Sequence, residues 1–304
     1  MTSVEGGYSA AMIRVAAPAK INLFLHIGER RPDGFHDLQS LIGFTEAGDQ
    51  LDISPSAELS LAVVGPFARA LPASDDNLVL KAARALRQKS RRTGGAAMVL
   101  TKNLPVASGI GGGSADAAAA LRGLDMLWGL NSPHEQLLKL AAELGSDVPV
   151  CLLSKTCWVE GRGEILSQLR PLPRMPAVLV NPGVAVSTPA VFGQLNVRSG
   201  TGRSRPAKAL ESLWDVISYL GDAENDLEAP ACELAPVIQE VLNAFDHEPG
   251  CALAAMSGSG GTCFALFHDP DFARGAASRI AQDHPEWWVS LTRFAGPEIG
   301  EPVQ

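Results

Sequence analysis

Hydrophobic residues near the N-terminus recur with the period of two that is typical of a β-strand. In the second part of the segment Ile13–Gly28, the apolar positions of this pattern are Leu23, Leu25 and Ile27. Successive side chains of a strand point to opposite faces, so Lys20 and Asn22 should lie on one face together. The pattern therefore predicts a strand that carries two polar side chains facing the same way.

The rest of the first half alternates between strand-like and helix-like patterns. Asp75, Asp76 and Asn77 can cap a helix, and Ser132 with Glu135 has the spacing of a capping box. The predicted strands are Leu38–Phe44, Gln50–Ser54, Leu59–Val64 and Met98–Thr101, and the predicted helices are Leu78–Lys89, Ala115–Trp128 and a segment that ends at Gly145.

The second half contains a further series of strands and helices. An amphipathic stripe is formed by Leu210, Leu213, Trp214, Ile217 and Leu220. The other predicted elements are strands over Ala177–Val180, Ala252–Met256, Thr262–Phe267 and Trp287–Phe294, and helices over Glu233–Phe245 and Pro270–Gln282. This succession suits a compact α+β fold. A chain of 304 residues is long enough for two packed domains.

Composition and charge exclude several classes of function. Hydrophobic residues make up 46% of the chain and charged residues 19%, as in a folded globular protein. The net charge of -8 argues against a nucleic-acid or anionic-membrane partner, because both favour a basic patch. The five cysteines form no C-x-x-C pair, the histidines are scattered, and no apolar run approaches a membrane span. We therefore expect a cytoplasmic protein with free thiols and no metal-binding cluster.

A glycine-rich segment directly before a predicted helix is the strongest candidate for chemistry. Four glycines in five positions leave backbone N–H groups open to a ligand, and the helix N-terminus adds partial positive charge. The pattern predicts a loop that binds the phosphates of ATP, although a plain flexible turn is the simpler alternative. The expected nucleotide-binding residues are Pro105, Val106, Ala107, Ser108, Gly109, Ile110, Gly111, Gly112, Gly113, Ser114 and Ala115.

Two better-known phosphate loops do not fit this segment. A Walker A loop requires Gly-Lys-Ser/Thr, which the chain lacks. A dinucleotide-binding loop requires a second parallel strand ending in an acidic residue about 20 residues later. Here that region is the predicted helix that ends at Gly145. The segment therefore favours a kinase over an oxidoreductase.

Three other segments carry residues that could take part in catalysis, each with a structural alternative. Lys20 lies within an apolar strand and needs either a partner or a route to water, as on an edge strand. Asp147 follows the predicted helix end and could be the N-cap of the next helix or a general base. The run Ser257–Thr262 is glycine-rich and could be a tight hairpin between two strands.

Taken together and in this order, these segments resemble the GHMP kinase superfamily. Within it, the chain is most similar to kinases that act on a cytidine diphosphate sugar alcohol in the non-mevalonate route to isoprenoids. The similarity extends from about Ala17 to Phe267. It is carried by Pro18–Leu41, the glycine loop, Gly145–Val150, Val159–Glu164, Asn181–Phe192 and Glu224–Asp226.

The resemblance implies a two-domain α+β fold. A ribosomal-S5-like domain (residues 1–158) would carry the lysine strand and the ATP loop. A ferredoxin-like domain (residues 159–304) would follow, with the site between the two. The cofactors would be ATP and Mg²⁺, and the partner a small-molecule substrate. The protein would be a monomer or a homodimer.

The resemblance also implies roles for individual residues. Asp147 would accept the proton of the substrate 2-hydroxyl, and Lys20 beside it would orient that hydroxyl. Mg²⁺ and the loop amides would neutralise charge on the phosphates, while Ser114 is a candidate contact to the ion. The implied substrate-binding residues are Asn22, His36 for the cytosine and Phe192 for stacking on it, and those implied for the adenine pocket are Asn77 and Lys102.

Some positions depart from the family pattern. Ala115 replaces a serine, Asp116 would place a negative charge near the phosphates, and Phe35 stands where a tyrosine is common. The basic loop Ser199–Arg205 is longer than usual and is expected to be a mobile, solvated loop, with a flap that contacts phosphate as the alternative. Two alternatives stay open: a GHMP kinase for an alcohol such as mevalonate or homoserine, and a GHMP-fold protein that binds ligands without catalysis.

Overall fold

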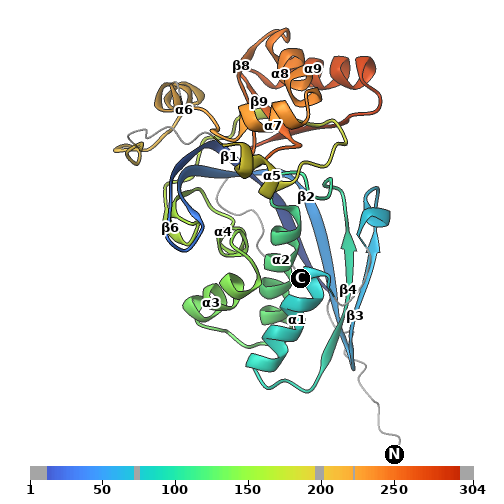
Figure 1. Ribbon diagram of the computed structural model, residues 1–304. Helices are drawn as coiled ribbons and strands as arrows, with labels where there is room; N and C mark the ends of the chain where they lie inside the picture. The colour runs from blue at the N-terminus through green and yellow to red at the C-terminus, as the bar shows by residue number, and fades with distance from the viewer. Residues whose placement is uncertain (1–11, 72–75, 196–201, 222, 295–304) are drawn as a thin grey trace, which may run out of the picture.

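A computed structural model describes residues 12–71, 76–195, 202–221 and 223–294. Its first sheet has the order β3-β4-β2-β5-β6, and β1 pairs with β2 along nearly its whole length (Figure 1). The strands of this sheet are β1 (Ile13–Arg30), β2 (His36–Ser56), β3 (Leu59–Val64), β4 (Gly95–Thr101), β5 (Cys157–Gly161) and β6 (Ile165–Gln168). The long antiparallel pair of β1 and β2 is the central element of this half.

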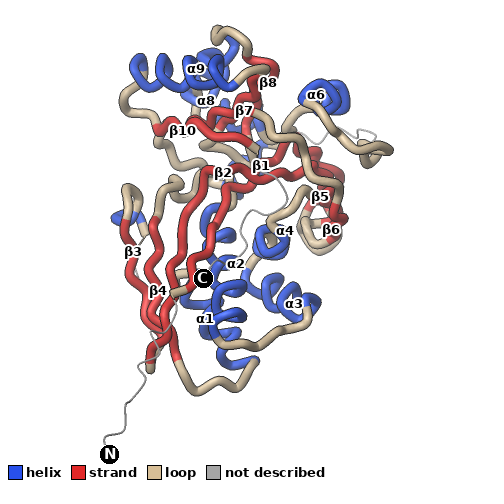
Figure 2. The backbone as a smooth tube through the Cα atoms, turned by 180° about the vertical axis from the view of Figure 1, so that it is seen from behind, coloured by secondary structure: helices blue, strands red, loops and turns tan. Residues whose placement is uncertain are grey.

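Four helices pack beside this sheet, on the same side of it (Figure 2). They are α1 (Leu78–Lys89), α2 (Gly112–Leu127), α3 (His134–Leu144) and α4 (Val148–Leu153), and a short 3₁₀ turn, η1, covers Ala68–Ala70.

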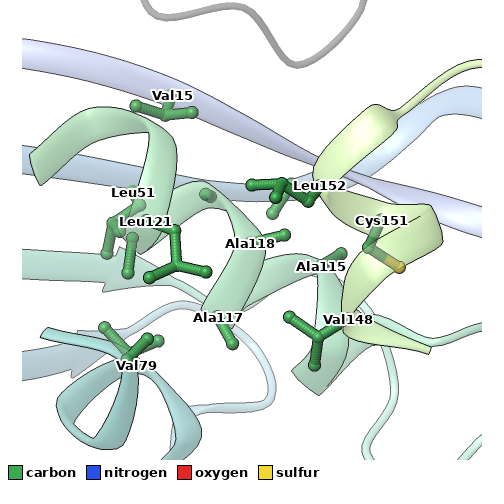
Figure 3. Close-up of a cluster of buried hydrophobic side chains, with 14 of the residues drawn as sticks. Val15, Leu51, Val79, Ala115, Ala117, Ala118, Leu121, Val148, Cys151 and Leu152 are labelled. Carbon is green, nitrogen blue, oxygen red and sulfur yellow. The ribbon is translucent and has the colours of Figure 1, made fainter. Parts of the chain in front are cut away.

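The helix α2 can pack closely on the sheet because its inner face is made of small residues. Ala117, Ala118, Ala119 and Ala120 are fully buried. A Cβ atom on Gly123 would clash with Ile53 Cδ1. Figure 3 shows this core, in which alanines of α2 pack between residues of the strands and of α4. The tight packing fixes the N-terminus of α2, and with it the glycine loop.

The second sheet has the order β10-β7-β9-β8, with every neighbouring pair antiparallel. The strands are β7 (Pro176–Asn181), β8 (Cys251–Met256), β9 (Cys263–Phe267) and β10 (Trp288–Arg293), and the helices are α5 (Thr188–Gln194), α6 (Leu213–Leu220), α7 (Glu228–Leu234), α8 (Val237–Asp246) and α9 (Pro270–Asp283). Strand order and connections are those of a ferredoxin-like βαββαβ unit. The α+β prediction is confirmed.

The two sheets share a buried apolar interface. Ile21 and Leu23 of β1 belong to one cluster with Leu179 of β7 and with Phe264 and Leu266 of β9. Side chains of this size each contribute about 1.5–3 kcal/mol when buried. The interface therefore holds β1 firmly against the second half.

The expected domain boundary after residue 158 falls inside a strand. Residue 158 lies within β5, which pairs with β2 and β6 of the first sheet. The second sheet begins only with β7 at Pro176. The division between the sheets thus lies between β6 and β7.

Several local predictions are wrong, and each has a physical reason. The strand β2 runs unbroken where two strands were predicted. The helix α3 begins after Pro133 without a capping box, because the Ser132 amide donates to Asp125 instead. Pro236 separates α7 from α8, where one helix was predicted.

The stripe on α6 also differs from the prediction. Trp214 is 65% exposed, whereas Val216 and Leu220 face the core. None of the described helices is long and apolar enough to cross a membrane.

Candidate active site

The side chain of Lys20 is buried on β1 and has two polar partners. Its Nζ donates to Asn22 Oδ1 at 3.0 Å and lies 3.1 Å from Asp147 Oδ2. The Lys20 side chain is 6% exposed, while that of Asp147 is 44% exposed. Lys20 and Asn22 thus share one face of the strand, as the period-two pattern predicted. The pair places a carboxylate at the protein surface with a fixed cation behind it.

Asp147 stands directly before α4 but does not cap it. The residue occupies the N-cap position, yet its side chain makes no capping hydrogen bond. The carboxylate turns instead toward Lys20. Since α4 packs on α2 through Val148 and Cys151, the position of this carboxylate is tied to the helix that follows the glycine loop (Figure 3).

A buried serine fixes the orientation of Asn22. The Asn22 Nδ2 group donates to Ser40 Oγ at 2.8 Å, and Ser40 Oγ donates in turn to the Phe24 carbonyl at 2.6 Å. The hydroxyl proton is therefore engaged, and the amide oxygen must face Lys20. Sequence analysis missed Ser40, which lies on β2 opposite Leu25 of β1.

The glycine loop runs beside Lys20. The Lys20 backbone N–H donates to the Ile110 carbonyl at 3.0 Å. A Cβ atom on Gly111, which has φ +65°, would lie 3.2 Å from Lys20 Cβ. The helix α2 then begins at Gly112, earlier than the predicted Ala115, and has no acidic residue in its first turn. Its positive end is thus presented next to the Lys20–Asp147 pair.

The side chain of Lys102, which was expected at the adenine pocket, is buried and paired within the protein. The side chain is 1% exposed and its Nζ is bonded to both Asp49 and Asp116. Asp49 Oδ1 also accepts the backbone N–H groups of Asn103 and Leu104, at 2.6 and 2.8 Å. A Cβ atom on Gly112 would lie 3.1 Å from Lys102 Nζ. Lys102, Asp49 and Asp116 therefore form a buried support of three ionisable groups under the loop.

Burial governs the protonation of this support. Burial raises the pKa of Asp116 to about 8; the Lys102 cation opposes the rise and the Asp49 charge adds to it. Burial alone would lower the pKa of Lys102, but the two carboxylates raise it above its ordinary value. Asp116 is 2% exposed. The expectation that it adds charge to the phosphate site is therefore wrong, because its carboxyl faces Lys102 in the interior.

Asn77 caps α1 next to the loop. Its Oδ1 accepts the Val79 backbone N–H at 2.9 Å, and the residue is 8% exposed. The start of α1 borders the loop, since a Cβ atom on Gly113 would lie 3.6 Å from Leu78 Cδ1. The position is compatible with a nucleotide pocket, but the side-chain oxygen is already used in capping.

His36 and Phe192 come together from distant parts of the chain. Their ring centroids are 5.7 Å apart and the rings are tilted by 41°. His36 Nδ1 lies 3.0 Å from the Gly28 carbonyl, which can only accept a hydrogen bond. The proton of a neutral ring is therefore on Nδ1, and Nε2 offers a lone pair. At this separation the rings contact each other, so a base would have to part them or stack on one of them.

Phe35, at a position where the family commonly has tyrosine, is an aromatic residue beside His36. Its ring is 56% exposed, and the guanidinium of Arg162 lies 5.2 Å from the ring centroid. The Arg162 guanidinium also approaches Asp33, at 3.7 Å. The turn between β1 and β2 thus contacts the turn between β5 and β6 at this end of the sheet. The exposed Phe35 ring is available for stacking.

The basic loop Ser199–Arg205 is only partly covered by the described residues. Its positions 199–201 lie outside them. Arg203 is held by its backbone N–H, which donates to Gln39, and by its guanidinium, which donates to the Tyr219 and Leu220 carbonyls. The described end of the loop is therefore tied to β2 and α6, contrary to the expectation of a mobile loop.

Comparison with known proteins agrees with this geometry. The family model for the GHMP kinases N terminal domain matches residues 77–155, and that for the GHMP kinases C terminal domain matches residues 207–286. A 4-diphosphocytidyl-2-C-methyl-D-erythritol kinase from Parvibaculum lavamentivorans is 49% identical over 92% of this chain and 98% of its own. One from Cereibacter sphaeroides is 47% identical over 94% of this chain and 100% of its own.

A solved structure extends the likeness to three dimensions. The crystal structure of a 4-(cytidine 5'-diphospho)-2C-methyl-D-erythritol kinase superposes with a TM-score of 0.73 at 32% identity, covering 93% of this chain and 100% of the other. The similarity thus includes both sheets and the segments that carry the residues described above.

Proposed function

Since the chain belongs to the GHMP kinase family, which uses ATP as phosphate donor, we propose that it phosphorylates the 2-hydroxyl of 4-diphosphocytidyl-2-C-methyl-D-erythritol. This reaction is a step of the non-mevalonate route to isoprenoid precursors. The observation that carries the proposal is the contact between Lys20 Nζ and Asp147 Oδ2, at 3.1 Å beside the glycine loop. It supplies a general base next to an anion-binding helix terminus.

The transfer step needs one base and a well-placed acceptor. The 2-hydroxyl oxygen forms a bond to the γ-phosphorus of ATP, and the bond from that phosphorus to the β,γ-bridging oxygen breaks as ADP leaves. Asp147 takes the proton of the hydroxyl. Lys20 and Asn22 hold the attacking oxygen in line, and positioning of this kind contributes much of the rate in phosphoryl transfer.

The N-terminus of α2 and the loop before it would receive the phosphates. Their backbone N–H groups and the helix dipole stabilise negative charge at this point. Ser114 lies in the first turn of α2 and is half-buried, so it brings a hydroxyl group close to this helix N-terminus.

Mg²⁺ enters the proposal as the ion that accompanies ATP. Among the described residues, no group of three or more His, Cys, Asp or Glu side chains is arranged to hold a metal. The Asp116 carboxyl is turned toward Lys102. The first turn of α2 carries the Ser114 hydroxyl. This donor set fits an ion held mainly by phosphate oxygens and water, with Ser114 as the protein contact. When bound, the ion would neutralise charge on the transferred group.

The cytidine end of the substrate would lie near His36. The lone pair on Nε2 suits the amino group of cytosine, which donates, and does not suit the carbonyl at the same place in uracil. Phe192 and Phe35 offer ring faces for stacking. Recognition of this kind favours the cytidine substrate over mevalonate or homoserine, which have no base.

A substrate panel tests the proposal. The purified protein is incubated with Mg-ATP and, separately, the cytidine diphosphate substrate, mevalonate or homoserine, and ³¹P NMR identifies any new phosphate ester. We expect a new monoester only with the cytidine substrate. Turnover of mevalonate or homoserine instead would support another branch of the family, and no transfer to any alcohol would favour a protein that binds without catalysis.

A further inference from the structure

The glycine-rich turn between β8 and β9 packs directly on the glycine loop. A Cβ atom on Gly109 would lie 2.6 Å from the carbonyl oxygens of both Ser257 and Gly260. A Cβ atom on Gly258 would lie 2.5 Å from the Gly109 carbonyl oxygen. The main chain of the turn between β8 and β9 thus contacts the main chain of the glycine loop, so a shift of one requires a shift of the other.

The hydroxyl of Ser257 joins this turn to two segments of the site. The residue has no exposed surface. Its Oγ accepts the Asn22 backbone N–H at 3.1 Å and donates to the Gly109 carbonyl at 3.4 Å. Since the Asn22 N–H uses a lone pair, the single hydroxyl proton is free to point at Gly109. One side chain thus bridges the strand of Lys20 and the loop expected to hold the phosphates.

The position of Ser257 is itself fixed from behind by Asn225. The Asn225 Nδ2 group donates to the Met256 and Gly258 carbonyls at 2.9 and 2.8 Å, and its Oδ1 accepts the Leu227 N–H at 3.0 Å. Asn225 is 4% exposed. Every polar atom of its amide is engaged, so the residues on both sides of Ser257 are held rigidly.

We propose that Ser257 is a positioning residue that sets the distance between the acceptor strand and the nucleotide loop. The proposal rests on the kinase function proposed above. Asn22 and Lys20 lie on the acceptor side, and Gly109 opens the donor loop. A displacement of about 1 Å between reacting groups can cost roughly a hundredfold in rate. A hydroxyl that bonds both sides at once is suited to prevent such a displacement.

The test is a Ser257→Ala variant compared with a matched control. Thr156→Val removes another buried hydroxyl, which accepts a hydrogen bond from the Leu172 N–H at 3.2 Å. Neither Thr156 nor Leu172 belongs to the proposed site. We expect Ser257→Ala to lower kcat per nucleotide-binding site by about tenfold to a hundredfold, with KM for each substrate within about twofold. Thr156→Val should lose comparable stability and keep its kcat. Equal kcat in the wild type and Ser257→Ala would overturn the proposal.

A second measurement does not depend on turnover. Hydrogen exchange of the Asn22 amide should accelerate by about tenfold or more in Ser257→Ala and stay unchanged in Thr156→Val, because the bond to Oγ is lost only in the first. An unchanged Asn22 amide in Ser257→Ala would contradict the bridge even if the wild type phosphorylated no alcohol, so failure of the two proposals can be told apart. If the alanine variant does not fold, Ser257→Cys, which is close in volume, takes its place in both measurements.

Discussion

The buried support under the loop gives the most quantitative prediction. Lys102 Nζ is bonded to Asp49 and Asp116, and all three side chains are at most 3% exposed. Lys102→Met keeps the length and volume of the side chain and removes the charge. Two carboxyl groups are then left facing each other without a cation. At neutral pH the folded state must either desolvate this charge or take up a proton.

The expected loss follows from the cost of breaking a buried pair. Removal of one partner costs about 3–5 kcal/mol, because the remaining charge is uncompensated. That corresponds to a factor of roughly 10²–10⁴ in the unfolding constant. With a urea m-value of about 3 kcal/mol/M, the midpoint should fall by about 1–2 M. Removing the second buried carboxyl group as well, in Lys102→Met/Asp116→Leu, should recover part of the loss.

Urea unfolding followed by circular dichroism measures this effect, and ATP titration in the absence of urea measures the alternative. The structure predicts a lower midpoint with KM for ATP within about threefold of the wild type, since the side chain is sealed from the ligand side. An unchanged midpoint together with a clearly raised KM would refute the reasoning. That result would indicate that Lys102 contacts the nucleotide in the adenine pocket, as the family resemblance implies.

Three further predictions test other parts of the site. The folded-state pKa of Asp116 is raised to about 8. The wild type should therefore lose stability relative to Asp116→Asn as the pH rises from about 4 to 8, by at most about 1.4 kcal/mol per pH unit. If the difference in unfolding free energy between the two proteins, measured in urea, were the same at pH 6 and pH 8, this prediction would be contradicted. The lone pair on His36 Nε2 should favour the cytidine substrate over its uridine analogue by about 10-fold to 100-fold in kcat/KM, and His36→Ala should abolish most of the preference; equal preference in both proteins would count against the assigned tautomer. Gly109→Ala should weaken ATP binding by about tenfold or more, because φ is +78° and the new Cβ would meet two carbonyl oxygens, whereas Gly94→Ala, where nothing lies within 4 Å, should bind normally by calorimetry; equal affinities would exclude a rigid loop.

Local patterns were enough to predict that Lys20 and Asn22 lie together. The period of two predicted Lys20 and Asn22 on one side of a strand, and in the structure Lys20 Nζ lies 3.0 Å from Asn22 Oδ1. The glycines before α2 marked a loop at a helix N-terminus for the same kind of local reason. The contact between Lys20 and Asp147 spans 127 residues, and it was expected only through the family resemblance.

Other features depend on tertiary packing that no local pattern records. Lys102 was assigned to a ligand site, but its partners Asp49 and Asp116 come from a different strand and from α2. Trp214 fits a helical apolar stripe, yet it is exposed and lies beside the His268 ring, with centroids 5.3 Å apart and the rings tilted by 37°. The Ser257 turn was recognised as a hairpin, and only the folded chain brings it against Gly109.

The central claim is that Asp147 is the base that deprotonates the acceptor hydroxyl. The most direct measurement is the rate of ADP release from Mg-ATP and the cytidine diphosphate substrate, with Asp147→Asn beside the wild type and ATP affinity measured for both by calorimetry. We predict that kcat falls by about 10²–10⁴ in the variant, while the affinity for ATP is unchanged. A variant that keeps more than about a tenth of the wild-type kcat would contradict the account.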